Sequence, residues 1–198
     1  MRWLPYRRAF ILLLLILGIL TGGCKTRSEP AKPADYFPMT KGSYWEYEGE
    51  GNEFASFTRE VLFTGQNRAQ LREDNGGTVM ASVIETTDTA VIRVFSRGEA
   101  YGEENYLEKQ SNENTVLLQS PIEVGTRWEF QEGTKEITDT QAVVKTPAGE
   151  FNDCIAVTAK IGESTVVEYY KAGIGMVKRE FNSEGFTVTS SLKKYEIK

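Results

Sequence analysis

The chemistry open to this chain is narrowed by the absence of histidine from its 198 residues. Without histidine, the Ser-His and Cys-His dyads and most zinc and copper sites are excluded. Among the carboxylates, Glu46 and Glu129 occupy matching positions after a tryptophan, and could serve a carboxylate-based glycan hydrolase. A duplicated element would repeat its surface residues as well, so we expect both glutamates to be structural and the protein not to be an enzyme.

Metal and cofactor motifs are also missing from the sequence. Neither a calcium-loop pattern nor a phosphate-binding glycine loop occurs, so we predict no metal and no cofactor. The acidic segments 48–53 and 103–105 leave a weak calcium site as the alternative to solvated loops. Cys154 lies in an apolar strand pattern, and we expect it to be a buried, unreactive thiol.

The other cysteine, Cys24, follows a short positive segment and a short apolar segment. Arg2, Arg7 and Arg8 precede the uncharged run Ala9–Leu20. As a helix this run would reach about 18 Å, well short of the roughly 30 Å hydrocarbon core of a bilayer. The pattern is typical of a secretory signal, with an uncleaved membrane helix as the alternative.

The segment Leu20-Thr21-Gly22-Gly23-Cys24 resembles the bacterial lipoprotein signal, the lipobox, with Thr21 where leucine is most usual. In that family a diacylglyceryl group is attached to the cysteine thiol, and the signal is removed just before it. The resemblance implies that residues 1–23 are a signal peptide and that Cys24 carries acyl chains such as palmitate. The protein would then be exported and anchored by lipid to the outer face of the cell membrane, or to an outer membrane where one exists. The alternative is a secreted protein with a free thiol at Cys24.

The residues after Cys24 separate this anchor from a folded domain. Residues 24–35 hold prolines, charges and no large apolar side chain, so we predict a flexible tether. The signal contains three of the 23 basic residues and none of the 28 acidic ones, which leaves the exported chain with a net charge of −8. Such a surface argues against nucleic acid as a partner and against direct binding to an anionic bilayer.

Residues 36–198 contain a repeated element. Pro38–Tyr47 and Pro121–Phe130 both fit the pattern P-[MI]-x-x-G-[ST]-x-W-E-[YF]. We therefore predict two pseudo-repeated units, residues 36–110 and 111–198. Because residues i and i+2 of a strand share a face, the rings of each copy should point inward, either into the core or as a ligand-facing aromatic shelf: Trp45, Tyr47, Trp128 and Phe130.

The rest of the domain alternates apolar and polar residues between turn signals. Asn75-Gly76-Gly77 is a hairpin signal, and further strands are predicted over 57–64, 68–72, 78–85, 89–96, 115–119, 135–145, 151–161, 164–171, 174–181 and 186–197. This pattern predicts an all-β, antiparallel fold after the signal helix. Its two units could form a curved sheet, a sandwich or an open barrel.

Three segments of the domain resemble an uncharacterised family of exported proteins from Firmicutes and related bacteria. They are Tyr36–Tyr47, Thr146–Cys154 and Glu168–Lys178. In some relatives the similar region lies beside a copper-amine-oxidase-like amino-terminal domain, which this chain lacks. The resemblance implies an exported β-domain and carries over no catalytic residue.

Together these features predict a membrane-anchored protein of the cell envelope. Its partners would be the membrane, through the lipid, and an unknown envelope ligand or protein bound in a sheet concavity. The alternative is a structural or assembly module of an envelope complex, which would use a sheet edge or an exposed aromatic patch.

Overall fold

The computed structural model describes residues 30–198, and Ala31–Lys198 form one compact unit. The predicted signal helix and Cys24 lie outside the described residues. The unit contains one short 3₁₀ helix and twelve strands: η1 (Pro33–Tyr36), β1 (Tyr44–Glu50), β2 (Phe57–Thr64), β3 (Arg68–Asp74), β4 (Val79–Thr86), β5 (Ala90–Arg97), β6 (Thr115–Gln119), β7 (Arg127–Phe130), β8 (Gly133–Thr146), β9 (Gly149–Ile161), β10 (Ser164–Lys171), β11 (Gly175–Ser183) and β12 (Phe186–Glu196).

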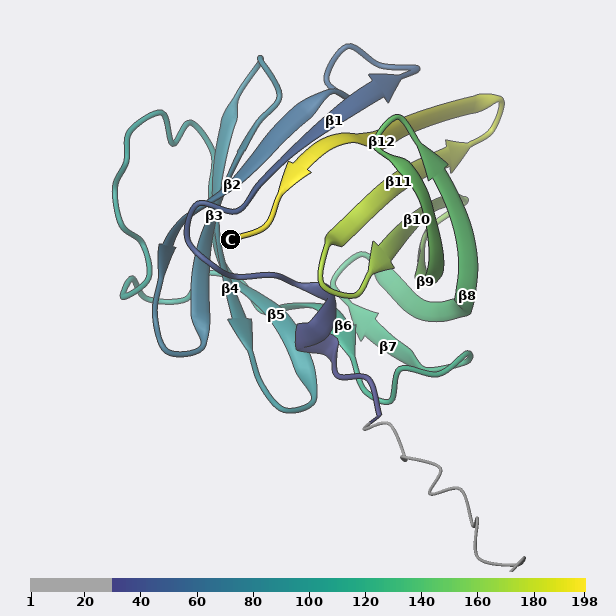
Figure 1. The fold of residues 1–198 in the computed structure, drawn as a ribbon, viewed down its shortest axis with the longest axis horizontal. Helices are drawn as coiled ribbons and strands as arrows, with labels where there is room; N and C mark the ends of the chain where they lie inside the picture. Colours follow the sequence, from purple (N-terminus) through teal and green to yellow (C-terminus); the bar gives the residue numbers. More distant parts are fainter. Residues whose placement is uncertain (1–29) are drawn as a thin grey trace, which may run out of the picture. The chain divides into compact units, whose positions relative to one another are not determined.

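All twelve strands belong to a single antiparallel sheet in the order β6-β5-β4-β3-β2-β1-β12-β11-β10-β9-β8-β7. Sequential strands pair with one another except β6 and β7, and the first strand pairs with the last, so that Tyr44 lies opposite Glu196. The sheet curls into a nearly closed barrel (Figure 1). The all-β, antiparallel prediction is confirmed, and the open barrel is the one of the three expected shapes that forms.

The barrel has one seam, between the edge strands β6 and β7. Side chains bridge this seam in place of a backbone ladder. The indole N–H of Trp128 donates to the carbonyl oxygen of Val116 at 3.0 Å, and the Gln119 amide donates to the carbonyl oxygen of Arg127 at 3.4 Å. These contacts cover two strand edges that would otherwise offer unpaired backbone groups to other chains.

The barrel interior is apolar over part of its length and charged over the rest. Alternate residues of each strand face inward, and on several strands a charged residue lies two positions before an apolar inward residue. Val61 and Ile137 are fully buried, whereas Arg59 and Lys135 lie two residues away on the same faces. The main core thus fills one part of the barrel and gives way to a polar chamber.

A second, smaller core lies under the loop between β5 and β6. Tyr106 and Leu107 in this loop pack with Ala81, Val83 and Val94 of β4 and β5. Figure 1 shows this long loop outside the strands, beside β3. The loop is fixed by Gln70, which is almost fully buried and hydrogen-bonds both to the Glu104 carbonyl (2.8 Å) and to the Tyr106 amide (2.7 Å).

Replacing Gln70 with alanine should therefore loosen this loop. The buried Tyr106 amide would lose its acceptor, which costs about 1–3 kcal/mol, and the more exposed Glu104 carbonyl would lose its donor. We expect the free energy of unfolding to fall by about 2 kcal/mol and proteolysis between Gly98 and Glu113 to become faster. Limited proteolysis and urea unfolding measure both effects. The matched control is Gln141→Ala, an exposed glutamine on β8, and equal effects of the two changes would contradict the assignment.

The compact unit begins before the residue that opens the predicted β-domain. Pro33–Tyr36 form η1, Pro33 and Tyr36 are buried, and the Gly173 amide donates to the Asp35 carbonyl at 2.8 Å. The last residues of the predicted tether thus pack on the domain. Among residues 30–198 no helix has the length and apolar character needed to cross a membrane.

Candidate functional site

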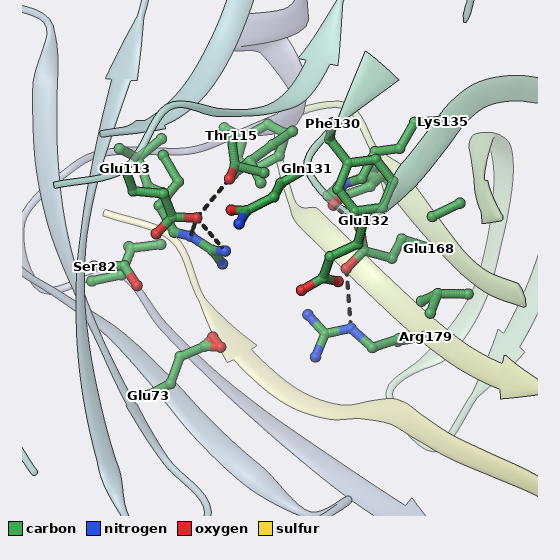
Figure 2. Close-up of a pocket in the computed structure, with 18 of the residues that line it drawn as sticks. Glu73, Ser82, Glu113, Thr115, Phe130, Gln131, Glu132, Lys135, Glu168 and Arg179 are labelled. Atoms are coloured by element: carbon green, nitrogen blue, oxygen red, sulfur yellow. Dashed lines mark hydrogen bonds and ion pairs between the residues drawn. The ribbon is translucent and has the colours of Figure 1, made fainter. Parts of the chain in front are cut away.

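A cavity of about 380 Å³ lies among the strands of the barrel (Figure 2). Its size falls within the usual range of small-molecule sites. The lining combines an apolar wall with a set of charged side chains. The apolar residues are Phe37, Leu71, Ile84, Leu117, Phe130, Ala159, Ile161 and Val166, and the charged residues are Arg59, Glu73, Arg93, Glu113, Glu132, Lys135, Glu168 and Arg179.

Two ion pairs of the cavity join residues that lie opposite each other on neighbouring strands. Arg59 of β2 and Glu73 of β3 are cross-strand partners, and their closest N–O distance is 2.9 Å. Burial alone would raise the pKa of Glu73, but the guanidinium groups of Arg59 and Arg179 outweigh burial and lower it. The carboxylate is therefore held in its ionised form.

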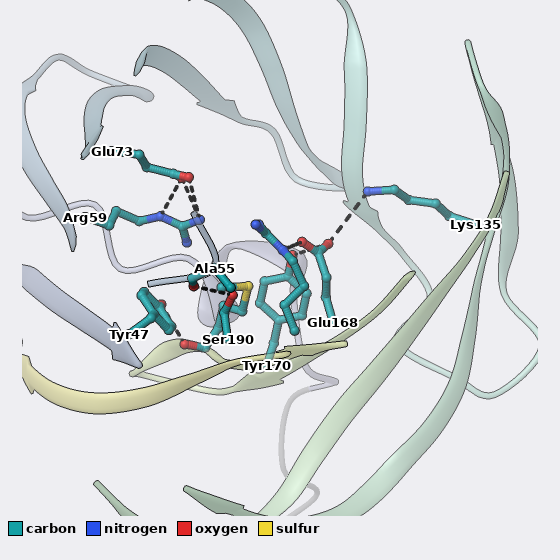
Figure 3. Close-up of polar contacts among 10 residues, drawn as sticks. Tyr47, Ala55, Arg59, Glu73, Lys135, Glu168, Tyr170 and Ser190 are labelled. Carbon is teal, nitrogen blue, oxygen red and sulfur yellow. Dashed lines mark hydrogen bonds and ion pairs between the residues drawn. The ribbon is translucent and has the colours of Figure 1, made fainter. Parts of the chain in front are cut away.

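The second cross-strand pair is the centre of a larger network. Glu168 of β10 lies opposite Arg179 of β11, whose Nε–H donates to its carboxylate at 3.0 Å. The Tyr170 hydroxyl donates to the same carboxylate at 2.9 Å (Figure 3). Burial opposes the charge on Glu168, yet Arg179, Lys135 and the Tyr170 hydrogen bond lower its pKa to about 2.

A third ion pair lies near the seam. Glu113, just before β6, accepts hydrogen bonds from Arg93 at 2.6 and 2.8 Å and from the Thr115 hydroxyl at 2.6 Å. These hydrogen bonds outweigh partial burial and lower the pKa of Glu113. Arg59, Arg93 and Arg179 thus each have a carboxylate partner at hydrogen-bonding distance.

Lys135 of β8 is different from the three arginines. Its side chain is 9 % exposed, its Nζ lies 3.9 Å from Glu168, and the Phe130 ring centroid is 5.6 Å away. Among the described residues it makes no hydrogen bond. Burial lowers the pKa of Lys135, and the nearby charges of Arg93 and Arg179 act in the same direction against the attraction of Glu168. The cavity therefore holds a cation whose hydrogen-bonding capacity is unused.

The turn between β7 and β8 brings a fourth carboxylate to this cavity. Glu132 is exposed, and its side chain points from the turn into the opening (Figure 2). The next residue, Gly133, allows the hairpin to lie against β9, because a Cβ at this position would be 1.9 Å from the Lys160 carbonyl oxygen. Glu132 is thus placed by a close backbone contact that only glycine permits.

The aromatic residues of the first repeat copy lie in the main core. Trp45 donates its indole N–H to the Ile174 carbonyl at 2.7 Å, and the Tyr47 hydroxyl donates to the Met176 carbonyl at 2.8 Å. Burial raises the pKa of Tyr47 to about 12. Both rings belong to the main core and neither lines the cavity, so they act in packing.

The second copy divides between the two roles. Trp128 is buried in the same core and closes the seam, whereas Phe130 lines the cavity and is the only one of the four predicted aromatic residues to do so. The glutamates that follow the tryptophans are not brought together. Glu46 forms an ion pair with Lys193 at 3.0 Å, and Glu129 is exposed on β7, six strands away in the sheet.

Cys154 is a fully buried free thiol, and burial raises its pKa to about 11. A thiolate is therefore disfavoured there. Between residues 30 and 198 no group of three or more Cys, Asp or Glu side chains is arranged to hold a metal ion.

The charged residues of the cavity were not predicted as site residues. In Lys135-Glu136-Ile137, the lysine shares the inward face with the buried isoleucine, and Arg59 has the same relation to Val61. A charge two positions from a core residue on a strand is the signal that marks such an inward charge. This spacing can be used only once the core residues of the strand are known.

Comparison with known proteins gives no family for this chain. No protein-family model matches it, and no curated protein matches it. One solved structure that it resembles is "a putative lipoprotein" from Parabacteroides distasonis, at 13% identity and a TM-score of 0.47. Another is "a putative exported protein with YmcC-like fold" from Bacteroides fragilis, at 12% identity and a TM-score of 0.47. Each likeness covers 81% of this chain and 98% of the other.

Proposed function

We propose that this protein is a lipid-anchored lipoprotein of the bacterial cell envelope whose barrel binds a small ligand without catalysing a reaction. The cavity inside the barrel carries the binding part of the proposal. It combines an apolar wall with charged groups and is large enough for a small molecule. The lipobox-like segment ending at Cys24 carries the location.

The state of the cavity carboxylates supports binding over catalysis. Glu73, Glu113 and Glu168 all have lowered pKa values because arginines neutralise them. A general acid must be protonated near the working pH, and these groups are ionised there. Glu46 and Glu129, the two glutamates that the sequence pattern proposes for carboxylate chemistry, do not line the cavity.

Replacing Cys24 with serine tests the anchor. A hydroxyl cannot replace the thiol in lipid attachment, so we expect the variant to lose its acyl chains and to leave the membrane fraction almost completely. Cell fractionation and intact-protein mass spectrometry measure the two results. Cys154→Ser is the matched control and should leave the lipid in place. A Cys24→Ser protein that still sediments with membranes would contradict lipid anchoring.

Native mass spectrometry tests the binding proposal on the exported chain, residues 24–198, made soluble by Cys24→Ser. After incubation with an envelope extract, we expect a bound mass that organic solvent releases. Leu117→Trp, which replaces an aliphatic side chain of the cavity wall with an indole ring, should abolish this binding. Retention of a protein partner and no small molecule, in both forms, would instead favour an assembly module.

A further inference from the structure

We propose that the ligand of this cavity is an amphipathic anion, with a carboxylate or phosphate head bound at Lys135 and an apolar body against the wall formed by Leu117, Phe130, Ile161 and Val166. The inference rests on the proposed binding function and specifies the chemistry of the ligand. It follows from the way in which the cavity distributes its charges and its apolar surface.

The head group is assigned by Lys135. A buried ammonium group needs a charge that compensates it and acceptors for its N–H groups, and Lys135 has only the first, through Glu168. Glu168, the nearest carboxylate, is already bound by Arg179 at 3.0 Å and by Tyr170 at 2.9 Å, and lies 3.9 Å from Lys135 (Figure 3). The Lys135 ammonium thus faces the cavity without a hydrogen-bond acceptor among the described residues. A ligand oxygen anion would supply that acceptor.

Two arginines strengthen the preference for an anion at this place. Arg179 donates only its Nε–H to Glu168, and Arg93 uses Nε and Nη2 for Glu113. Each therefore keeps N–H groups that make no hydrogen bond within the described part of the chain. Guanidinium N–H groups suit carboxylate and phosphate oxygens. A cationic head group would instead meet three positive side chains.

Glu132 supplies the negative charge that an anionic ligand would otherwise bring to the cavity. Apart from Glu132, the cavity is lined by four cations and three carboxylates, so it carries one excess positive charge. The exposed Glu132 side chain points into the opening, and it balances that charge from the turn (Figure 2). An anionic ligand would neutralise the excess positive charge in place of Glu132. The Glu132 carboxylate would repel that ligand, because the two charges have the same sign.

A matched pair of probes tests the head group. Anilinonaphthalene sulfonate and its uncharged parent, phenylnaphthylamine, share one apolar body and differ in the anion. With the exported chain carrying Cys24→Ser, we expect the sulfonate to bind more tightly than the parent. Lys135→Met should weaken the sulfonate about 10- to 100-fold, as expected for a lost charged hydrogen bond, and change the parent by less than about twofold.

Glu132→Gln is the second variant, and its exposed position keeps it independent of folding. We expect it to tighten sulfonate binding about two- to fivefold, because a like charge is removed. Glu129→Gln, on the same hairpin but outside the cavity lining, is the matched control and should have no effect. A sulfonate affinity unchanged by both Lys135→Met and Glu132→Gln would overturn the inference.

The outcomes separate this inference from the proposed function. If both probes bind equally well and Leu117→Trp blocks them, the cavity binds ligands but has no anion site. If neither probe binds, the binding function itself fails. Competition with decanoate, decyl phosphate and decanol then separates the sources of the anion. Displacement by either anion at lower concentration than decanol supports the inference, and equal displacement by decanol contradicts it.

Discussion

Replacing Glu168 with alanine is expected to lower the free energy of unfolding by about 3–5 kcal/mol. The change removes the acceptor of Arg179 and Tyr170 and the nearest carboxylate of Lys135, all inside the barrel. Lys135, whose side chain is 9 % exposed, and Arg179, whose side chain is 35 % exposed, would then lack a compensating carboxylate. Leaving a buried charge without its partner costs more than the ion pair itself contributes. Chemical unfolding followed by tryptophan fluorescence measures the loss.

The matched control for Glu168 is Glu180→Ala. Glu180 also pairs with a lysine, Lys178 at 2.6 Å, and its side chain is 25 % exposed, compared with 14 % for Glu168. Ion pairs that keep contact with solvent contribute about 0–1 kcal/mol, so this change should have a smaller effect than Glu168→Ala. Similar losses for the two variants would show that the charged layer of the barrel contributes no more than a surface pair.

Glu168 also predicts how stability depends on pH. Its pKa is lowered from 4.5 to about 2 in the folded protein. Its contribution is therefore fully present above about pH 4.5, and it is lost as the pH falls toward 2, since protonation then favours the unfolded chain. The difference corresponds to about 3 kcal/mol at neutral pH. In Glu168→Gln, the fall in stability between pH 4.5 and 2 should be shallower by this amount.

Replacing Trp128 with alanine is expected to cost about 3–5 kcal/mol and to open the seam of the barrel. The variant loses a buried ring and the hydrogen bond that links β7 to the Val116 carbonyl of β6. We expect faster hydrogen exchange in β6 and β7 before global unfolding.

Trp45→Ala is the control for the seam. Trp45 is equally buried and also donates its indole N–H to a carbonyl, but it lies in the middle of the sheet order. Its loss should be similar in size without selective exchange in β6 and β7. If Trp128→Ala leaves exchange in these strands unchanged, the indole does not hold the barrel closed.

The strands could be predicted from sequence because their signals are local. Asn75-Gly76-Gly77 forms the turn between β3 and β4, and alternation around Ile155 and Val157 marks the inward face of β9. The choice of a barrel could not be made in this way, because it depends on the pairing of Tyr44 with Glu196 across the whole domain.

The charged cavity could not be predicted from local sequence patterns either, because it also depends on contacts between distant strands. Lys135 and Arg59 are charged residues in alternating strands, and such residues usually face solvent. The cost of burying their charges is offset by ion pairs with Glu168 and Glu73, which come from other strands. Of the predicted aromatic residues, Phe130 lines the cavity, because it lies two residues after the buried Trp128 on the same face of β7.

The pairing of β1 with β12 sets the order in which this domain can be completed. Five strands, β2 to β6, extend from one side of β1, and five, β7 to β11, lie beyond β12, so one joint unites the two halves of the sheet. This joint uses residues 186–196, which follow the other eleven strands along the chain. A chain that emerges from its amino end therefore cannot close the barrel until residues 186–196 have emerged. Truncation just before β12 would separate the halves, whereas a cut in the 120–126 loop would leave the joint intact.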